Sequence, residues 1–151
     1  MSATGDSPPS GDANERAAVG EVGALSGVPH ALPALMRASM LGKRAARVGF
    51  DWRDERAVRP KIAEELRETE VAISQQDPAA VTEELGDTLF ALVNWARLLE
   101  VDPETALREA NHKFERRFAA MEGLISRRGL AIERLTPEAW ESLWNEVKES
   151  E

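Results

Sequence analysis

The sequence has no cysteine among its 151 residues. This absence excludes disulfide bonds and zinc sites with cysteine ligands, and it suits a reducing compartment. No apolar run approaches the roughly 18 residues needed to span a bilayer. The N-terminus also lacks the basic start and apolar stretch of a secretory signal. We therefore expect a cytoplasmic protein with no membrane partner.

Positive charge is also in short supply. Nineteen Lys and Arg residues against 27 Asp and Glu residues give a formal net charge of -8. Binding to a nucleic-acid backbone needs a basic field, so we expect no nucleic-acid partner. A small anion can still bind wherever basic side chains gather locally.

The composition changes near residue 32. Residues 1–31 hold five of the ten glycines and three of the eight prolines, with few large apolar side chains to offset the entropy of ordering. We predict a flexible Gly/Pro-rich tail over 1–31 and one folded domain over 32–151. Beyond the tail no stretch shows sustained strand alternation, so the predicted fold class is all-α.

Three capping residues stand directly before prolines, at Asp77-Pro78, Asp102-Pro103 and Thr136-Pro137. Each pair is typical of a helix start. With the periodic segments around them they predict five helices, over 33–47, 60–75, 78–99, 103–128 and 137–149. Two inward-facing stripes are predicted, Ile62, Leu66, Thr69 and Ile73 on the second helix and Leu107, Ala110, Phe114, Phe118 and Met121 on the fourth.

The helix predicted over 78–99 is apolar on every side. Leu89 and Leu92 share one face, whereas Phe90 and Trp95 lie on others. A helix of this kind must be covered all round, and four other helices are too few to do so. We therefore predict a homodimer whose interface includes this helix.

Two pairs of carboxylates are placed symmetrically about residue 76: Glu65 and Glu68 before it, Glu84 and Asp87 after it. Each pair has the i, i+3 spacing that puts both side chains on one side of a helix. In an antiparallel hairpin all four would meet at one level. Oxygen ligands alone favour a hard cation such as Mg²⁺ or Mn²⁺.

The acidic residues of these helices need not all be metal ligands. Glu64 points nearly away from the inward face and is a poorer ligand than its neighbour Glu65. The simpler alternative for all these residues is a pair of solvated acidic helix faces, which are common in a chain with 30% charged residues.

A basic cluster lies in the fourth helix, where Lys113 and Arg117 share one face and Arg116 lies beside them. Such a cluster matches the oxygens and the charge of a phosphate group. The alternative is a surface salt-bridge ladder with neighbouring glutamates, which contributes little energy.

Several uncharged side chains have two interpretations. Asn111 falls on the inward stripe of the fourth helix, and Asn94 lies on nearly the same face as Asp87; each either bonds a backbone carbonyl or contacts a ligand. Trp144 either packs in the core or covers a nucleobase. The same ambiguity applies to Phe50 and Trp52.

The sequence resembles the MazG nucleoside triphosphate pyrophosphohydrolases, in particular their C-terminal catalytic module. The resemblance covers about residues 32–149, and its blocks occur in order: A-R-V-G-F-D-W, E-E-L-R-E, E-E-L-G-D-T-L-F-A-L-V-N-W-A-R, A-N-H-K-F-E-R-R-F and L-W-N-E-V-K. Many MazG proteins carry two such modules, whereas this chain has one.

The resemblance implies an antiparallel helical bundle of the all-α NTP pyrophosphatase type, completed by dimerisation. It also implies Mg²⁺ held by the four carboxylates, and hydrolysis of a nucleoside triphosphate to the monophosphate and pyrophosphate. Lys113 and Arg117 would then bind the phosphates, and Trp144 would lie near the base.

A mechanism follows for such a site. We expect water to attack the α-phosphorus while Lys113, Arg117 and Arg116 stabilise the leaving pyrophosphate, and Glu64 to orient the water. The alternative is a non-hydrolytic helical protein that senses nucleotides or regulates a partner.

Overall fold

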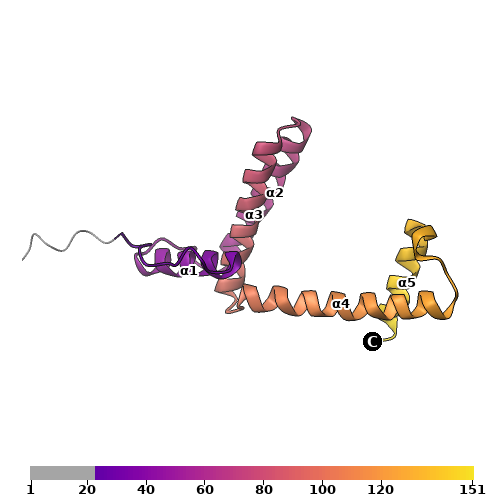
Figure 1. Cartoon of the computed structure of the whole chain (residues 1–151). Coiled ribbons are helices and arrows are strands. Elements are labelled where there is room, and N and C mark those ends of the chain that lie inside the picture. Colours follow the sequence, from indigo (N-terminus) through magenta and orange to yellow (C-terminus); the bar gives the residue numbers. More distant parts are fainter. Residues whose placement is uncertain (1–22) are drawn as a thin grey trace, which may run out of the picture.

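The computed structural model describes residues 23–151, and this part of the chain is built from helices and turns without a strand. The helices are α1 (Ala34–Arg47), α2 (Glu55–Ser74), α3 (Pro78–Leu98), α4 (Pro103–Arg127) and α5 (Pro137–Glu149), with a short 3₁₀ helix η1 (Ile132–Arg134) before the last (Figure 1). The predicted all-α class and the five helices are confirmed for the described residues. No helix among them is both long and apolar enough to cross a bilayer.

The three predicted helix starts are confirmed by capping hydrogen bonds. Asp77 accepts from the backbone N–H groups of Ala79 and Ala80, each at 3.1 Å. Asp102 accepts from the N–H of Thr105 at 2.7 Å, and the Thr136 hydroxyl accepts from that of Ala139 at 3.2 Å. These side chains satisfy backbone donors that have no partner inside the helix.

The start of α2 was predicted wrongly. The helix begins at Glu55 rather than at Pro60, and Pro60 lies inside it. The reason is a fourth cap: the Asp54 carboxylate accepts from Arg56 N–H at 3.1 Å and Ala57 N–H at 3.0 Å. This cap starts the helix more than a turn before the proline, and the helix continues through Pro60 although proline has no N–H to donate.

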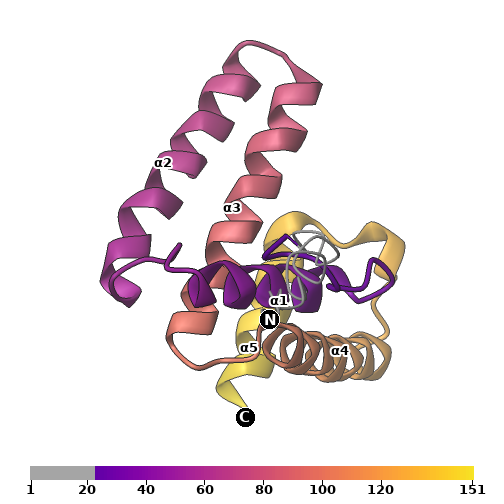
Figure 2. The same cartoon turned by 90° about the vertical axis from the view of Figure 1, so that its left-hand side faces the viewer.

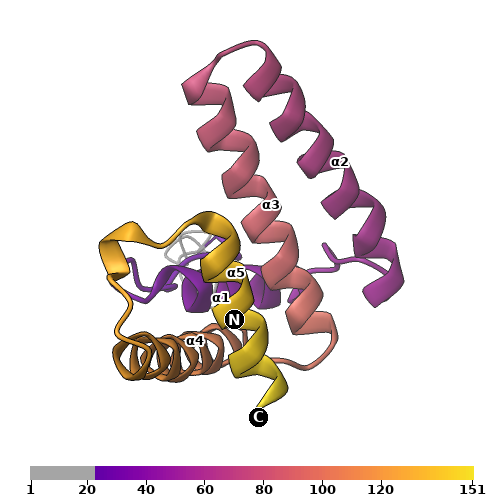
Figure 3. The same ribbon diagram turned by 90° about the vertical axis from the view of Figure 1, so that its right-hand side faces the viewer.

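The helices form two arms. Helices α2 and α3 run antiparallel as a hairpin, and α1 packs across the lower part of α3 (Figure 2). Helix α4 leaves the base of α3 in a different direction, and α5 folds back against its far end (Figures 1 and 3). One chain therefore makes a hairpin and a separate α4–α5 arm, and the complete antiparallel bundle stays a prediction.

A small apolar core joins α4 to α5. Met121, Ile125, Leu143 and Val147 are each buried, and Trp140 and Trp144 pack against them. The hairpin has no comparable cluster: α2 buries Val58, Glu65 and Ala72 at seven-residue spacing. The most buried side of α2 therefore contains a carboxylate.

Both predicted inward stripes are partly wrong within one chain. On α2, Leu66 and Ile73 are 49% and 59% exposed. On α4, Leu107 and Phe114 are 50% and 56% exposed, while Met121 is buried as predicted. The periodicity correctly identified apolar faces, but the hairpin and the α4–α5 arm diverge and leave these faces uncovered.

Most of the predicted tail, residues 1–22, lies outside the described residues, and its boundary at residue 31 stays a prediction. In the rest, Ser26 N–H donates to the Gly23 carbonyl at 2.8 Å, and Val28 is buried.

Candidate metal centre

The hairpin brings three of the predicted carboxylates together. Glu65 of α2 and Glu84 and Asp87 of α3 each offer an oxygen, and these oxygens lie within 4.8 Å of one another. Gln76, at φ 56°, adopts the left-handed conformation that ends α2 and lets the chain reverse. Residues equally far from this turn therefore face each other, as the symmetric spacing predicted.

Glu65 is the buried member of this trio. It is only 3% exposed, and Lys61, one helical turn earlier, places its Nζ 2.5 Å from Oε1 of Glu65. The Glu65 carboxylate raises the pKa of Lys61 through this hydrogen bond. A buried carboxylate needs such a partner or a metal ion. The same ammonium lies 3.5 Å from Glu64, whose side chain is 46% exposed.

The pKa of Glu84 is raised by its surroundings. Burial raises the pKa of its carboxyl, and the negative charges of Glu68, Glu65, Glu83 and Asp87 raise it further. Glu68 lies outside the close trio, yet its charge acts on Glu84. Mutual repulsion of this kind is relieved by a bound cation.

The donor set fits a hard divalent cation. All three members of the trio are carboxylates, which suit Mg²⁺ or Mn²⁺, and these ions usually keep several waters and bind substrate phosphates besides one or two protein carboxylates. The exposed Asp87 and half-buried Glu84 leave one side open for those ligands. Glu68, one turn beyond Glu65, stays a predicted ligand.

The basic residues of α4 lie elsewhere in the chain. Arg117 donates to the Glu151 carboxylate from Nε at 2.9 Å, and its guanidinium lies 5.5 Å from the ring centre of Trp144. Lys113 and Arg116 also act electrostatically on Glu151, lowering its pKa after the larger effect of Arg117.

Asn111 is exposed on the same helix, and Trp144 packs against Phe114, with ring centres 5.8 Å apart. Because the hairpin and α4 diverge from their common base (Figure 1), the single chain does not bring the basic cluster to the carboxylates.

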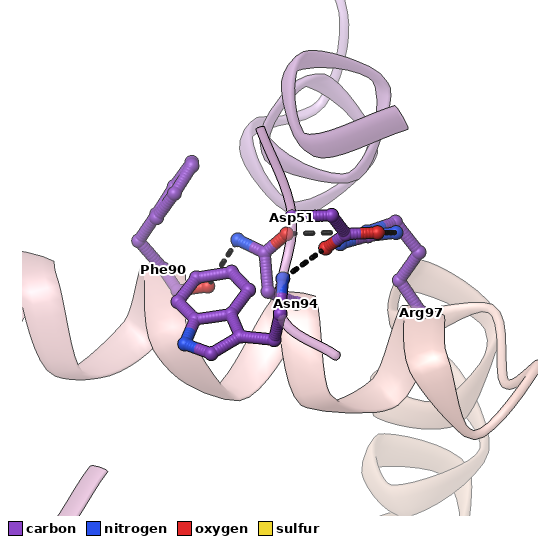
Figure 4. Close-up of polar contacts among 5 residues, drawn as sticks. Asp51, Phe90, Asn94 and Arg97 are labelled. Atoms are coloured by element: carbon purple, nitrogen blue, oxygen red, sulfur yellow. Dashed lines mark hydrogen bonds and ion pairs between the residues drawn. The ribbon is translucent and has the colours of Figure 1, made fainter. Parts of the chain in front are cut away.

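A second polar group was missed by the sequence reasoning. Arg97 of α3 binds the Asp51 carboxylate with both terminal nitrogens, at 3.0 and 2.5 Å, and its Nε donates to Oδ1 of Asn94 at 3.2 Å (Figure 4). The Asn94 amide in turn donates to the Phe90 carbonyl at 3.1 Å. Asn94 is 1% exposed. Its expected bond to a backbone carbonyl is confirmed, and its contact with a ligand stays a prediction.

The sequence contains a local pattern for the Lys61–Glu65 pair but none for the Asp51–Arg97 pair. Lys61 precedes Glu65 by four positions, a spacing that places both side chains together on a helix. Asp51 and Arg97 are 46 positions apart, and no local pattern links them.

Comparisons with known proteins agree with the family indicated by the sequence motifs. The family model of the MazG nucleotide pyrophosphohydrolase domain matches residues 53–120, a segment that contains α2, α3 and most of α4. The chain therefore carries a MazG nucleotide pyrophosphohydrolase domain, and the resemblance seen in the sequence is confirmed.

Two relatives show how far the similarity extends. The chain is 45% identical over 139 residues to the nucleoside triphosphate pyrophosphohydrolase of Escherichia coli strain K12, covering 91% of this chain and 53% of the relative. It is 44% identical over 130 residues to the nucleoside triphosphate pyrophosphohydrolase/pyrophosphatase MazG of Thermotoga maritima, covering 86% of this chain and 48% of the relative. The chain thus spans about half the length of these curated relatives.

Proposed function

We propose that this protein hydrolyses a nucleoside or deoxynucleoside triphosphate to the monophosphate and pyrophosphate, using Mg²⁺, with Mn²⁺ as a possible substitute. The observation that carries the proposal is the carboxylate trio of Glu65, Glu84 and Asp87 within a MazG domain. The names of the relatives support the same activity.

The four carboxylates Glu65, Glu68, Glu84 and Asp87 are the proposed metal ligands. A bound divalent ion supplies two things at such a site: it makes water a better nucleophile, and it neutralises phosphate charge. We propose that Glu64, whose side chain is 46% exposed and pairs with Lys61 at 3.5 Å, orients the attacking water and accepts a proton from it. Water attacks the α-phosphorus, the bond from the α-phosphorus to the α,β-bridging oxygen breaks, and pyrophosphate leaves.

The leaving pyrophosphate needs positive charge. We propose that Lys113, Arg116 and Arg117 supply it, with Asn111 as a polar contact to the substrate, and that Trp144 contacts the base. Guanidinium and ammonium groups match the oxygens and charge of phosphates. Since α4 diverges from the hairpin of its own chain, these roles require α4 of a second copy.

A homodimer also explains the uncovered apolar faces. Large exposed apolar side chains occur on both arms, among them Leu66, Leu89 and Phe90 on the hairpin and Leu107 and Phe114 on α4. Contiguous exposed apolar patches mark interaction surfaces. Packing the α4–α5 arm of one copy against the hairpin of another would cover both faces and complete an antiparallel bundle.

The composition supports a cytoplasmic location, with no nucleic-acid or membrane partner. Net negative charge opposes binding to polyanions.

The direct test is product analysis. The protein is incubated with a panel of nucleoside triphosphates and Mg²⁺, and pyrophosphate and orthophosphate are quantified separately. We expect pyrophosphate with the monophosphate, and loss of turnover in Asp87→Ala. Orthophosphate as the first product contradicts the proposal, and nucleotide binding without turnover favours the sensing or regulatory alternative.

A further inference from the structure

Two adjoining cavities lie beside the loop that joins α1 to α2, and both have Phe50 and Trp52 in their walls. The outer cavity, of about 370 Å³, also contacts Lys61. The inner one, of about 240 Å³, reaches Phe90 and Asn94 of α3. Small-molecule sites in proteins begin at roughly 300 Å³, so the outer cavity is large enough for a ligand and the inner one extends it.

The outer cavity opens next to the carboxylate trio. Lys61 is part of its wall, and the Nζ of the same residue lies 2.5 Å from Oε1 of Glu65. The cavity and the proposed metal ligands are therefore separated by one lysine side chain. A nucleotide whose phosphates lie at the carboxylates would have its nucleoside part at this cavity.

The walls suit an aromatic ring. Phe50 is 79% exposed, and Trp52 is half-buried beside it. Nucleobases stack on such side chains because every base has a flat aromatic face. The loop is also held in place before any ligand arrives, since Asp51, between the two aromatic residues, is bound by both terminal nitrogens of Arg97 (Figure 4). A preformed wall avoids the entropy cost of ordering it on binding.

The inner cavity is almost entirely apolar. Asn94 borders it, but this side chain is only 1% exposed, and its amide is fixed by two hydrogen bonds, one to the Phe90 carbonyl and one from Arg97 Nε. An apolar wall beside two aromatic side chains suits the flat face of a ring.

We propose that these two cavities bind the nucleoside part of the triphosphate, with the base against Phe50 and Trp52. This inference rests on the proposed function, and it identifies two residues of the hairpin side that contact the base. It adds to the base contact proposed for Trp144, whose ring packs against Phe114 and Arg117 on the other arm and would come from a second copy.

The test compares ligands with and without a base. Isothermal titration calorimetry measures the affinity of the full-length protein with Mg²⁺ for α,β-methylene analogues of several nucleoside triphosphates, which resist cleavage, and for inorganic tripolyphosphate. We expect Phe50→Ala and Trp52→Ala to weaken analogue binding by about 5- to 140-fold each, the loss typical of one stacked base, and to change tripolyphosphate binding less than twofold.

Val48→Ala is the matched control, because Val48 is 66% exposed near the same loop but lies outside both cavities. It should bind as the wild type does. Three results overturn the proposal: an equal loss for analogue and tripolyphosphate in Phe50→Ala, no loss in either aromatic variant, or a base-dependent loss in Trp144→Ala alone.

These measurements separate a failure of the proposed hydrolysis from a failure of the proposed base-binding role of the cavities. If the wild type releases no pyrophosphate but binds the analogues through Phe50 and Trp52, the proposed hydrolysis is wrong and the cavity assignment holds. If it hydrolyses triphosphates with an unchanged KM in both variants, the activity holds and the cavity assignment is wrong.

Discussion

Replacing Gly42 with alanine tests how α1 packs on α3. A Cβ at this position would lie 2.3 Å from Asn94 Oδ1 and 3.1 Å from Arg97 Nε. Asn94 is 1% exposed and held by the Phe90 carbonyl, so its amide cannot swing away freely. Overpacking of this kind costs about 1–3 kcal/mol, offset by the gain of about 0.5–1 kcal/mol for alanine over glycine in a helix.

Subtracting the gain from the cost predicts a loss of about 0–2.5 kcal/mol for Gly42→Ala, with a midpoint of about 1 kcal/mol. For a chain of this length the midpoint lowers Tm by about 2–4 °C. The matched control is Gly123→Ala in α4, where the added Cβ meets only the movable end of the Arg127 side chain at 3.2 Å. This variant should gain about 0.5–1 kcal/mol. Urea denaturation of both variants measures the difference, and a Gly42→Ala protein as stable as the Gly123→Ala protein refutes the described packing of α1 on α3.

Three further predictions concern charge, metal and assembly. The Arg97 guanidinium holds the pKa of Asp51 below its usual value of 3.8 through a side-chain hydrogen bond. The pair therefore contributes stability above that value and loses it as pH falls through the lower folded pKa, so Asp51→Asn should be less stable than the wild type at pH 7 by urea denaturation, and the difference should shrink as the pH is lowered below 3.8. Asp87→Asn should abolish the stabilisation that Mg²⁺ gives the wild type. This stabilisation raises Tm and amounts to about 2.7 kcal/mol of unfolding free energy at an Mg²⁺ concentration 100 times the Kd. Leu89→Glu places a charge on a side chain that is 50% exposed in one chain, and light scattering should show the monomer mass for this variant and twice that mass for the wild type.

Each of these three has a contrary outcome. A stability difference for Asp51→Asn that stays unchanged as the pH is lowered removes the ion pair as its cause. An equal Mg²⁺ shift in Asp87→Asn places the ion elsewhere. A wild type that is monomeric at micromolar concentration contradicts the homodimer.

Local patterns predicted the helices well because capping chemistry is local. Asp77, Asp102 and Thr136 each cap the helix that follows them, as the sequence indicated. Asp54 caps α2 in the same way, but the predicted start was Pro60, five residues after the observed start at Glu55. Helix starts are thus read from the cap more reliably than from the proline.

The carboxylate trio was predictable for a similar reason. Two helices joined by a short turn must place residues equidistant from that turn opposite each other, which brought Glu65 to Glu84 and Asp87. Contacts that depend on the path of distant segments were beyond local reasoning. The Asp51–Arg97 pair and the cavity around Phe50 form only because α1 crosses α3, and the exposure of Leu107 and Phe114 follows from the direction that α4 takes.

We propose that water attacks the α-phosphorus of a nucleoside triphosphate at the carboxylate trio. Turnover in H₂¹⁸O with Mg²⁺, followed by mass spectrometry of both products, tests this attack most directly. Attack at the α-phosphorus predicts one ¹⁸O atom in the nucleoside monophosphate and none in the pyrophosphate. Label found in pyrophosphate or in orthophosphate, with the monophosphate unlabelled, would contradict it.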